Sequence, residues 1–195
     1  MMERVTFKNS RKLTLVGHLY PSTSESIIIM CHGFMSSKYS KGRFEKLATA
    51  FNKSGHSALL FDFSGCGESD DDILTVEKEV DDLKSAIQFV KSKGYLTEYT
   101  PQEVRKKIVI DKRILEDFEL INQKELLEDV NCPVLIIHGN NDEEEKLLYE
   151  RSKTAMTLLS SDSKLEVIDG ANHSFLEHFH IVIKLTTEWF IKHFY

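Results

Sequence analysis

The stretch that decides the fold is SALLFDFSGCGESD at residues 57–70. Residues 57–63 are mostly apolar, as in strands that are buried on both faces of a parallel sheet. Residues 64–70 form a polar turn with two glycines. A helix should follow, because five apolar residues there are spaced 4, 3, 4 and 3 apart: Val76, Val80, Leu83, Ile87 and Val90. A buried strand, a turn and an amphipathic helix in this order predict one unit of an α/β fold.

The same alternation continues on both sides of this stretch. The pattern predicts an N-terminal β-hairpin from residues 5–7 and 13–19, and further strands at 27–31, 134–137 and 164–168. Helices are expected over about 44–54 and 145–159, and again after residue 174. The prediction is therefore a single α/β domain over residues 1–195, with a mostly parallel sheet and an N-terminal hairpin.

Length and composition exclude several classes of protein. The 195 residues are 41% hydrophobic, which suits a folded domain with a sizeable core. A net charge of −6 argues against a nucleic-acid partner, since such proteins usually carry a basic face. The longest apolar runs are far shorter than the ~20 residues of a membrane-spanning helix, and no signal peptide is visible. We therefore expect a cytoplasmic protein with no membrane partner, and reduced thiols at Cys31, Cys66 and Cys132.

Four polar or glycine-containing loops directly follow predicted strands. They are residues 32–34 (HGF), 62–69 (DFSGCGES), 138–142 (HGNND) and 170–173 (GANH). In open α/β sheets, ligands bind outside the carboxyl ends of the strands, where such loops gather. The four loops together therefore indicate a site.

These loops resemble those of α/β hydrolases, most of all the small esterases, lipases and serine-aminopeptidase-like members. The resemblance covers residues ~3–94 and ~132–195. It implies that the backbone N–H of Phe34 contributes to an oxyanion hole, and that His32, Gly33, Phe34 and Met35 line the substrate pocket. The turn at 62–69 has a structural role in this family.

The resemblance also implies that Asp142 is the catalytic acid and His173 the catalytic base. In such a pair, the imidazole takes a proton from the nucleophile and the carboxylate orients the imidazolium. Each residue also has a plainer interpretation. Asp142 heads an acidic run, residues 142–145, of the kind that is usually solvated, and a histidine in a loop is often a surface residue. This chemistry requires no cofactor, and we expect no metal site.

The family nucleophile lies in a G-x-S-x-G turn, which this sequence lacks. Its nine glycines are at positions 17, 33, 42, 55, 65, 67, 94, 139 and 170, and no two are four apart. With alanine or serine allowed at the glycine positions, only residues 22–26 fit, and they precede a strand. The nucleophile is therefore unknown. Ser36 or Ser37 is a remote alternative, because neither has the elbow context.

The gap falls after Gly94, where the family places the strand, elbow and helix of the nucleophile. One or two central strand–helix units, each of roughly 30 residues, are missing. We therefore expect strands 27–31 and 134–137 to be direct neighbours in the sheet. Residues 95–133 would then form a lid-like segment of short helices, or a solvated helical connection.

Three functions remain open. The first is a hydrolase of carboxylic esters or amides that is inactive as given. The second is a non-catalytic pseudo-hydrolase that binds a small acyl ligand or a protein. The third is an internally deleted form of an active hydrolase. All three predict a small-molecule ester or amide as substrate or ligand. The pseudo-hydrolase could instead bind a protein. Oligomeric state is not encoded in these motifs.

Overall fold

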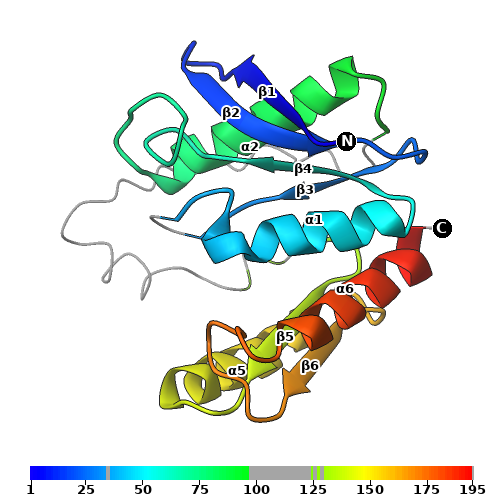
Figure 1. The fold of residues 1–195 in the computed structure, drawn as a ribbon. Helices are drawn as coiled ribbons and strands as arrows, with labels where there is room; N and C mark the ends of the chain where they lie inside the picture. Colours follow the sequence, from blue (N-terminus) through cyan, green and yellow to red (C-terminus); the bar gives the residue numbers. More distant parts are fainter. Residues whose placement is uncertain (34–35, 97–123, 125–126, 128–129, 195) are drawn as a thin grey trace. The chain divides into compact units, whose positions relative to one another are not determined.

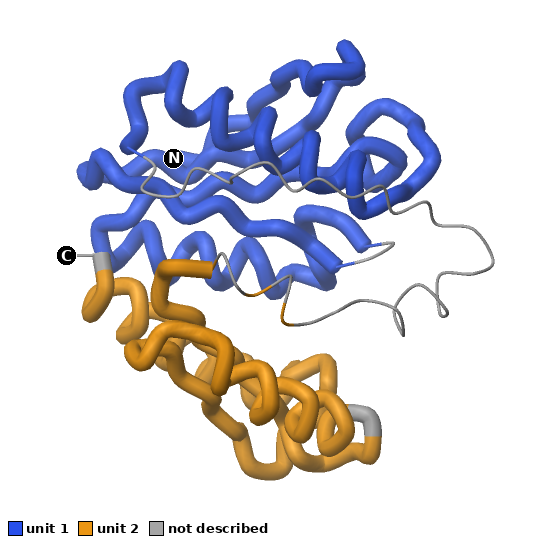
Figure 2. The backbone as a smooth tube through the Cα atoms, turned by 180° about the vertical axis from the view of Figure 1, so that it is seen from behind, with its two compact units in different colours: residues 1–117 blue, residues 118–195 orange. Residues whose placement is uncertain are grey.

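A computed structural model describes residues 1–33, 36–96, 124, 127 and 130–194 (Figure 1). The chain divides into two compact units, residues 1–117 and 118–195 (Figure 2). The prediction that both belong to one domain stays a prediction. Most of the predicted lid-like segment, together with Phe34 and Met35, lies outside the described residues.

Unit 1 contains a four-stranded sheet in the order β1-β2-β4-β3. The predicted hairpin is confirmed: β1 (Glu3–Lys8) pairs antiparallel with β2 (Thr14–Tyr20). β2 also pairs antiparallel with β4 (Ser57–Phe61), while β3 (Ile27–Met30) runs parallel to β4. The expectation of a mostly parallel sheet is therefore wrong for this unit. The sheet is mixed, because both edges of β2 form antiparallel ladders.

Two helices cover opposite faces of this sheet (Figure 1). Side chains alternate along a strand, so Leu59 and Phe61 of β4 share a face with a core that includes Ala86 and Val90 of α2 (Val76–Ser92). The other face of β4 packs against α1 (Arg43–Lys53), which buries Leu47, Ala48 and Phe51. Both helices lie where the apolar spacing predicted them. Thr75 is the N-cap of α2, and its side chain accepts the N–H of Lys78 at 3.2 Å.

The chain after α2 forms a short parallel pairing next to the start of β3. Ser26, which precedes β3, forms an isolated parallel bridge with Leu96, and the Leu96 N–H donates to the Glu25 carbonyl at 2.8 Å. Leu96 follows α2 after a turn at Gly94, whose φ is +91°. The chain thus returns to β3 after α2 and begins a parallel pairing there.

Unit 2 contains a parallel pair, β5 (Leu135–Gly139) and β6 (Lys164–Ile168). α5 (Glu143–Ala155) follows β5, a short 3-10 helix (Met156–Leu158) continues it, and α6 (Phe179–Phe194) follows β6. His138 contacts α5 residues, whereas Leu135 lies beside α6 residues. Because positions three apart in a strand point to opposite faces, α5 and α6 cover opposite faces of this pair.

The expectation that strands 27–31 and 134–137 are direct neighbours stays a prediction, because β3 belongs to unit 1 and β5 to unit 2, and each unit is described by itself. Among the described residues of each unit, β3 pairs with β4 in unit 1, and β5 pairs with β6 in unit 2. The apolar pattern identified both strands but could not specify their partners, because a buried strand exposes similar hydrogen-bonding edges on both sides. Among the described helices, none is long and apolar enough to cross a membrane.

Candidate functional site

In unit 1, His32 connects the loops that follow β3 and β4. Its ring is buried, and Nε2 accepts the backbone N–H of Phe63 at 3.2 Å. Nδ1 lies 2.9 Å from the carbonyl oxygen of Gly33, so it donates there. Both ring nitrogens are thus used within the protein. The contacts of His32 position the start of the predicted oxyanion loop.

A buried lysine, which the sequence did not indicate, anchors the other end of this loop. The Lys38 side chain is fully buried, and its Nζ donates to Asp62 Oδ2 at 2.6 Å and to Glu68 Oε1 at 2.7 Å. The Lys38 backbone N–H donates to Asp62 Oδ1 at 2.6 Å. Burial disfavours the charged ammonium, but the hydrogen bonds that it donates to these two carboxylates outweigh this effect and raise the pKa of Lys38.

The turn after β4 is built around the same carboxylate. The Glu68 N–H donates to Asp62 Oδ2 at 3.0 Å. Gly67 has φ +55°, and a Cβ there would lie 2.3 Å from the Asp62 carboxylate. Only glycine therefore fits, both for its backbone conformation and for the space available. These contacts account for the structural role that the resemblance implied for residues 62–69.

In unit 2, the loops after β5 and β6 are joined by backbone and side-chain bonds. The N–H groups of Asn140 and Asn141 both donate to the Ala171 carbonyl at 3.0 Å. The Asn140 side chain donates to Asp169 Oδ1 and accepts the Gly170 N–H, each at 2.8 Å. These bonds bring Asp142 and His173, the pair that the resemblance implied, close together.

The contact between these two residues involves the backbone of His173. Asp142 Oδ2 accepts the His173 backbone N–H at 3.1 Å, and Oδ1 accepts the Glu145 N–H at 2.7 Å. Asp142 is therefore the N-cap of α5. Two hydrogen bonds, the first and larger from Glu145, lower its pKa.

The ring of His173 contacts a different carboxylate. Its Nδ1 lies 2.6 Å from Oε1 of Glu145, whose side chain is 2% exposed, whereas the His173 side chain is 65% exposed. The interpretation of residues 142–145 as a solvated run is wrong at Glu145. A D-x-x-E pattern at a helix start was the available signal, since it places the glutamate at the third helical position, next to the cap.

Glu145 also binds groups at the end of β5. Its Oε2 accepts the Gly139 N–H at 2.8 Å and lies 3.1 Å from Nδ1 of His138. The other ring nitrogen of His138, Nε2, lies 2.8 Å from Oγ of Ser152. Burial would raise the pKa of Glu145, but the hydrogen bonds from His173, Gly139 and His138 outweigh it and lower the pKa. Glu145 is therefore a buried, ionised carboxylate.

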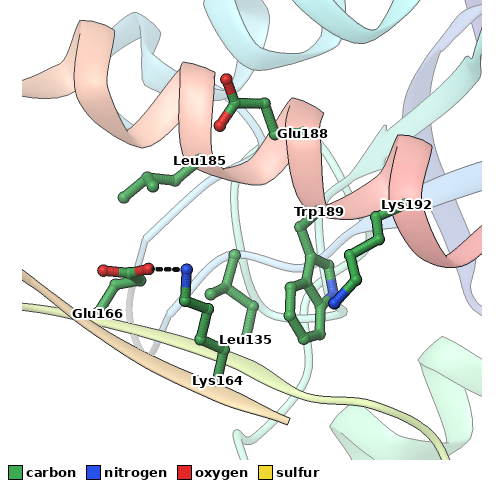
Figure 3. Close-up of a pocket in the computed structure, with 7 residues that line it drawn as sticks. All are labelled: Leu135, Lys164, Glu166, Leu185, Glu188, Trp189 and Lys192. Atoms are coloured by element: carbon green, nitrogen blue, oxygen red, sulfur yellow. Dashed lines mark ion pairs between the residues drawn. The ribbon is translucent and has the colours of Figure 1, made fainter. Parts of the chain in front are cut away.

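The linings of two hollows in unit 2 do not include Asp142 or His173. One, of about 210 Å³, separates α6 from the β5–β6 pair, with Leu185 and Trp189 facing Leu135 and the ion-paired Lys164 and Glu166 (Figure 3). The other, of about 420 Å³, includes Gly139, Asn140 and Tyr149 in its lining. Within the described ranges, no cluster of three or more His, Cys, Asp or Glu side chains is arranged to hold a metal ion.

His32 and Gly33 belong to unit 1, whereas Asp142 and His173 belong to unit 2. Each half of the predicted site is therefore described by itself. Phe34 and Met35, the other predicted pocket residues, lie outside the described residues. All three cysteines are free.

The sequence matches no family model and no curated protein. The structure is similar to Est1E from Butyrivibrio proteoclasticus, solved with ferulic acid bound: 16% identity, TM-score 0.78, covering 97% of this chain and 98% of that chain. The Pyrococcus furiosus esterase Pf2001 is 18% identical in sequence with a TM-score of 0.69, and the similarity covers 98% of this chain and 92% of that chain. The α/β hydrolase GrgF from Penicillium sp. sh18 is 15% identical with a TM-score of 0.71, and the similarity covers 99% of both chains.

These similarities extend over nearly the whole chain. The chain therefore has the α/β-hydrolase fold, with an overall structure similar to esterases of that fold.

Proposed function

We propose that this chain is an ester-hydrolase-type protein that retains a histidine–carboxylate pair but lacks the elbow serine, and that as given it hydrolyses esters at most slowly. One observation carries the proposal. An exposed imidazole, His173, lies 2.6 Å from a buried carboxylate, Glu145, in the loop where the resemblance puts the catalytic base. Such a pair takes up a proton and stabilises the imidazolium that results.

The missing group is the nucleophile. Ester hydrolysis by this class requires a serine that attacks the carbonyl carbon, and the base acts by removing its proton. The sequence contains no G-x-S-x-G segment. Without that serine, the predicted oxyanion loop and the base leave only the weak catalysis that binding and polarisation provide.

Hydrolysis of p-nitrophenyl acetate tests the proposal, with His173→Ala as the matched control. We expect the wild-type rate to be close to that of the variant, and both to be close to the background of the buffer. Robust hydrolysis that disappears in His173→Ala would contradict the proposal, because it would reveal a nucleophile outside the elbow pattern. Ser36 and Ser37 would then be the first serines to replace by alanine.

A second candidate is an internally shortened form of an active hydrolase. The bridge between Ser26 and Leu96 supports it, because the chain after α2 begins a parallel pairing next to the start of β3, where the family places its central strand. The gene and transcript sequences around the codon for Tyr95 provide the test. An intervening segment that restores a G-x-S-x-G turn would support shortening, and an uninterrupted gene would exclude any shortening between the gene and the protein.

Binding without turnover is the alternative outcome. Est1E was solved with ferulic acid, so this small aromatic acid is a suitable probe. Saturable calorimetric binding of ferulic acid, weakened by substitution of Phe34 or Met35 and accompanied by no ester turnover, would support a pseudo-hydrolase. The absence of binding over the soluble range of ferulic acid would count against a retained pocket for such acids.

A further inference from the structure

We propose that Glu145, and not Asp142, is the carboxylate that orients the ring of His173. This inference rests on the proposed role of His173 as the base, and concerns the residue that positions it. The first support is the contact itself: Glu145 Oε1 is 2.6 Å from Nδ1 of His173. Asp142 contacts the backbone of His173 instead, at 3.1 Å.

The contacts of Glu145 fix the position of its carboxylate, which a residue that orients another side chain requires. It occupies the third position of α5, where Asp142 caps its backbone N–H at 2.7 Å. Its second oxygen, Oε2, receives the Gly139 N–H at 2.8 Å and faces Nδ1 of His138 at 3.1 Å. With Oε2 bound on two sides and the side chain 2% exposed, Oε1 has one orientation, toward His173.

The carboxylate of Asp142 is occupied elsewhere. Its two oxygens accept two backbone N–H groups, one from Glu145 and one from His173. These bonds begin α5 and connect it to the loop that carries His173. Asp142 thus places the two residues next to each other, and Glu145 makes the contact with the ring.

The positions of the protons follow from these contacts. An ionised carboxylate only accepts hydrogen bonds, so both rings that face Glu145 carry their proton on Nδ1. Nε2 of neutral His138 must then accept from the Ser152 hydroxyl, which is 2.8 Å away. Nε2 of His173 has no proton, which is the state that a general base requires.

The tautomer of His173 therefore tests the inference. We would record ¹⁵N spectra of histidine-labelled protein at mildly alkaline pH, where imidazole is neutral, and assign them with His173→Ala and His138→Ala. Wild-type His173 should carry its proton on Nδ1. Asp142→Asn should keep this tautomer, because the hydrogen bonds of the Asp142 carboxylate go to the backbone N–H groups of Glu145 and His173.

Glu145→Gln should reverse the tautomer. Glutamine presents one oxygen and one NH₂ group, and the two donors at the Oε2 position, from Gly139 and His138, favour the oxygen there. The NH₂ group then faces His173 and donates to Nδ1, so the proton moves to Nε2. The bound Nδ1 proton, which should resonate at low field in the wild type, would be lost in this variant alone.

A wild-type His173 with its proton on Nε2 would overturn the inference without any variant. So would a reversal in Asp142→Asn, or an unchanged tautomer in a folded Glu145→Gln. If circular dichroism shows that Glu145→Gln does not fold, the wild type and Asp142→Asn still decide between the two carboxylates. The tautomer is measured without substrate, so this result stands or falls independently of the ester assay.

Discussion

Replacing the buried Lys38 by methionine should destabilise unit 1 more than any loss of an exposed charge. Methionine has nearly the length of the lysine stem, so it retains most of the packing and removes the ammonium. Asp62, which is fully buried, then loses the cation 2.6 Å from its Oδ2. Removal of one partner from a buried ion pair costs about 3–5 kcal/mol, because the other charge is left uncompensated.

The contacts of Asp62 place the expected loss near the lower end of that range. Two backbone N–H groups, of Lys38 and Glu68, still donate to the Asp62 carboxylate in the variant. We therefore expect a loss of about 3 kcal/mol in the free energy of unfolding. Urea titrations followed by circular dichroism measure it.

Arg4→Met is the matched control, because Arg4 pairs with the same Glu68 at 3.1 Å but with side chains that are 55% and 39% exposed. Exposed pairs contribute at most about 1 kcal/mol, so this variant should lose much less stability. The double variant Lys38→Met, Asp62→Asn should be less destabilised than the sum of its parts, since it leaves no buried charge. A loss in Lys38→Met no larger than in Arg4→Met would refute the reasoning.

Three further predictions concern unit 1. Hydrogen bonds, the first and largest from Lys38, lower the pKa of Glu68 from 4.5 to about 2. Glu68 therefore stabilises the fold above pH 4.5, and this contribution is lost as the pH falls toward 2. Urea titrations across that range should show a weaker pH dependence in Glu68→Gln, and identical curves would contradict this origin. Thr75→Ala should lower the free energy of unfolding by about 1 kcal/mol because α2 loses its N-cap, and Thr75→Ser should retain most of the capping energy. Equal losses of stability in thermal unfolding of the two variants would argue against capping. Gly42→Ala should lower the free energy of unfolding by about 1–2 kcal/mol through its positive φ alone, since among the described residues none but its chain neighbours comes within 4 Å of its Cβ position. Gly67→Ala should cost clearly more because of the Asp62 carboxylate, and similar midpoints in urea would show that the turn relaxes.

Local pattern was enough to predict most individual elements. The five apolar residues from Val76 to Val90 lie in α2, and Thr75 caps it as expected. The strand predicted at 164–168 is β6 without change. Helix periodicity, caps and apolar runs depend on neighbours a few residues away, so a single sequence contains them.

Pairing between strands was not encoded in this way. β3 and β5 are both short apolar runs; β3 pairs with β4 in unit 1 and β5 pairs with β6 in unit 2, and the sequence specified neither pairing. β2 was recognised as part of a hairpin, but its second antiparallel ladder, with β4, was not foreseen. The edges of a strand are backbone groups that are the same in every residue, so side-chain pattern says little about which strand they bind.

The candidate site, too, was predicted only in part by the sequence. The family resemblance implied that Asp142 and His173 act as a pair, and in the structure Asp142 Oδ2 accepts the backbone N–H of His173. Glu145 stands within an acidic run and Lys38 within a polar loop, where neither appeared distinctive. Their roles come from partners 28 and 24 residues away, His173 and Asp62.

By itself, the sequence determined that this protein alternates strands and helices, carries four loops after strands, and lacks a G-x-S-x-G turn. Those are properties of residues close together in the chain. Only the tertiary structure decided which charged side chains are buried and which carboxylate contacts His173. The physical reason is that burial makes an ionised group depend on the few donors within hydrogen-bonding distance, and folding alone brings those donors to it.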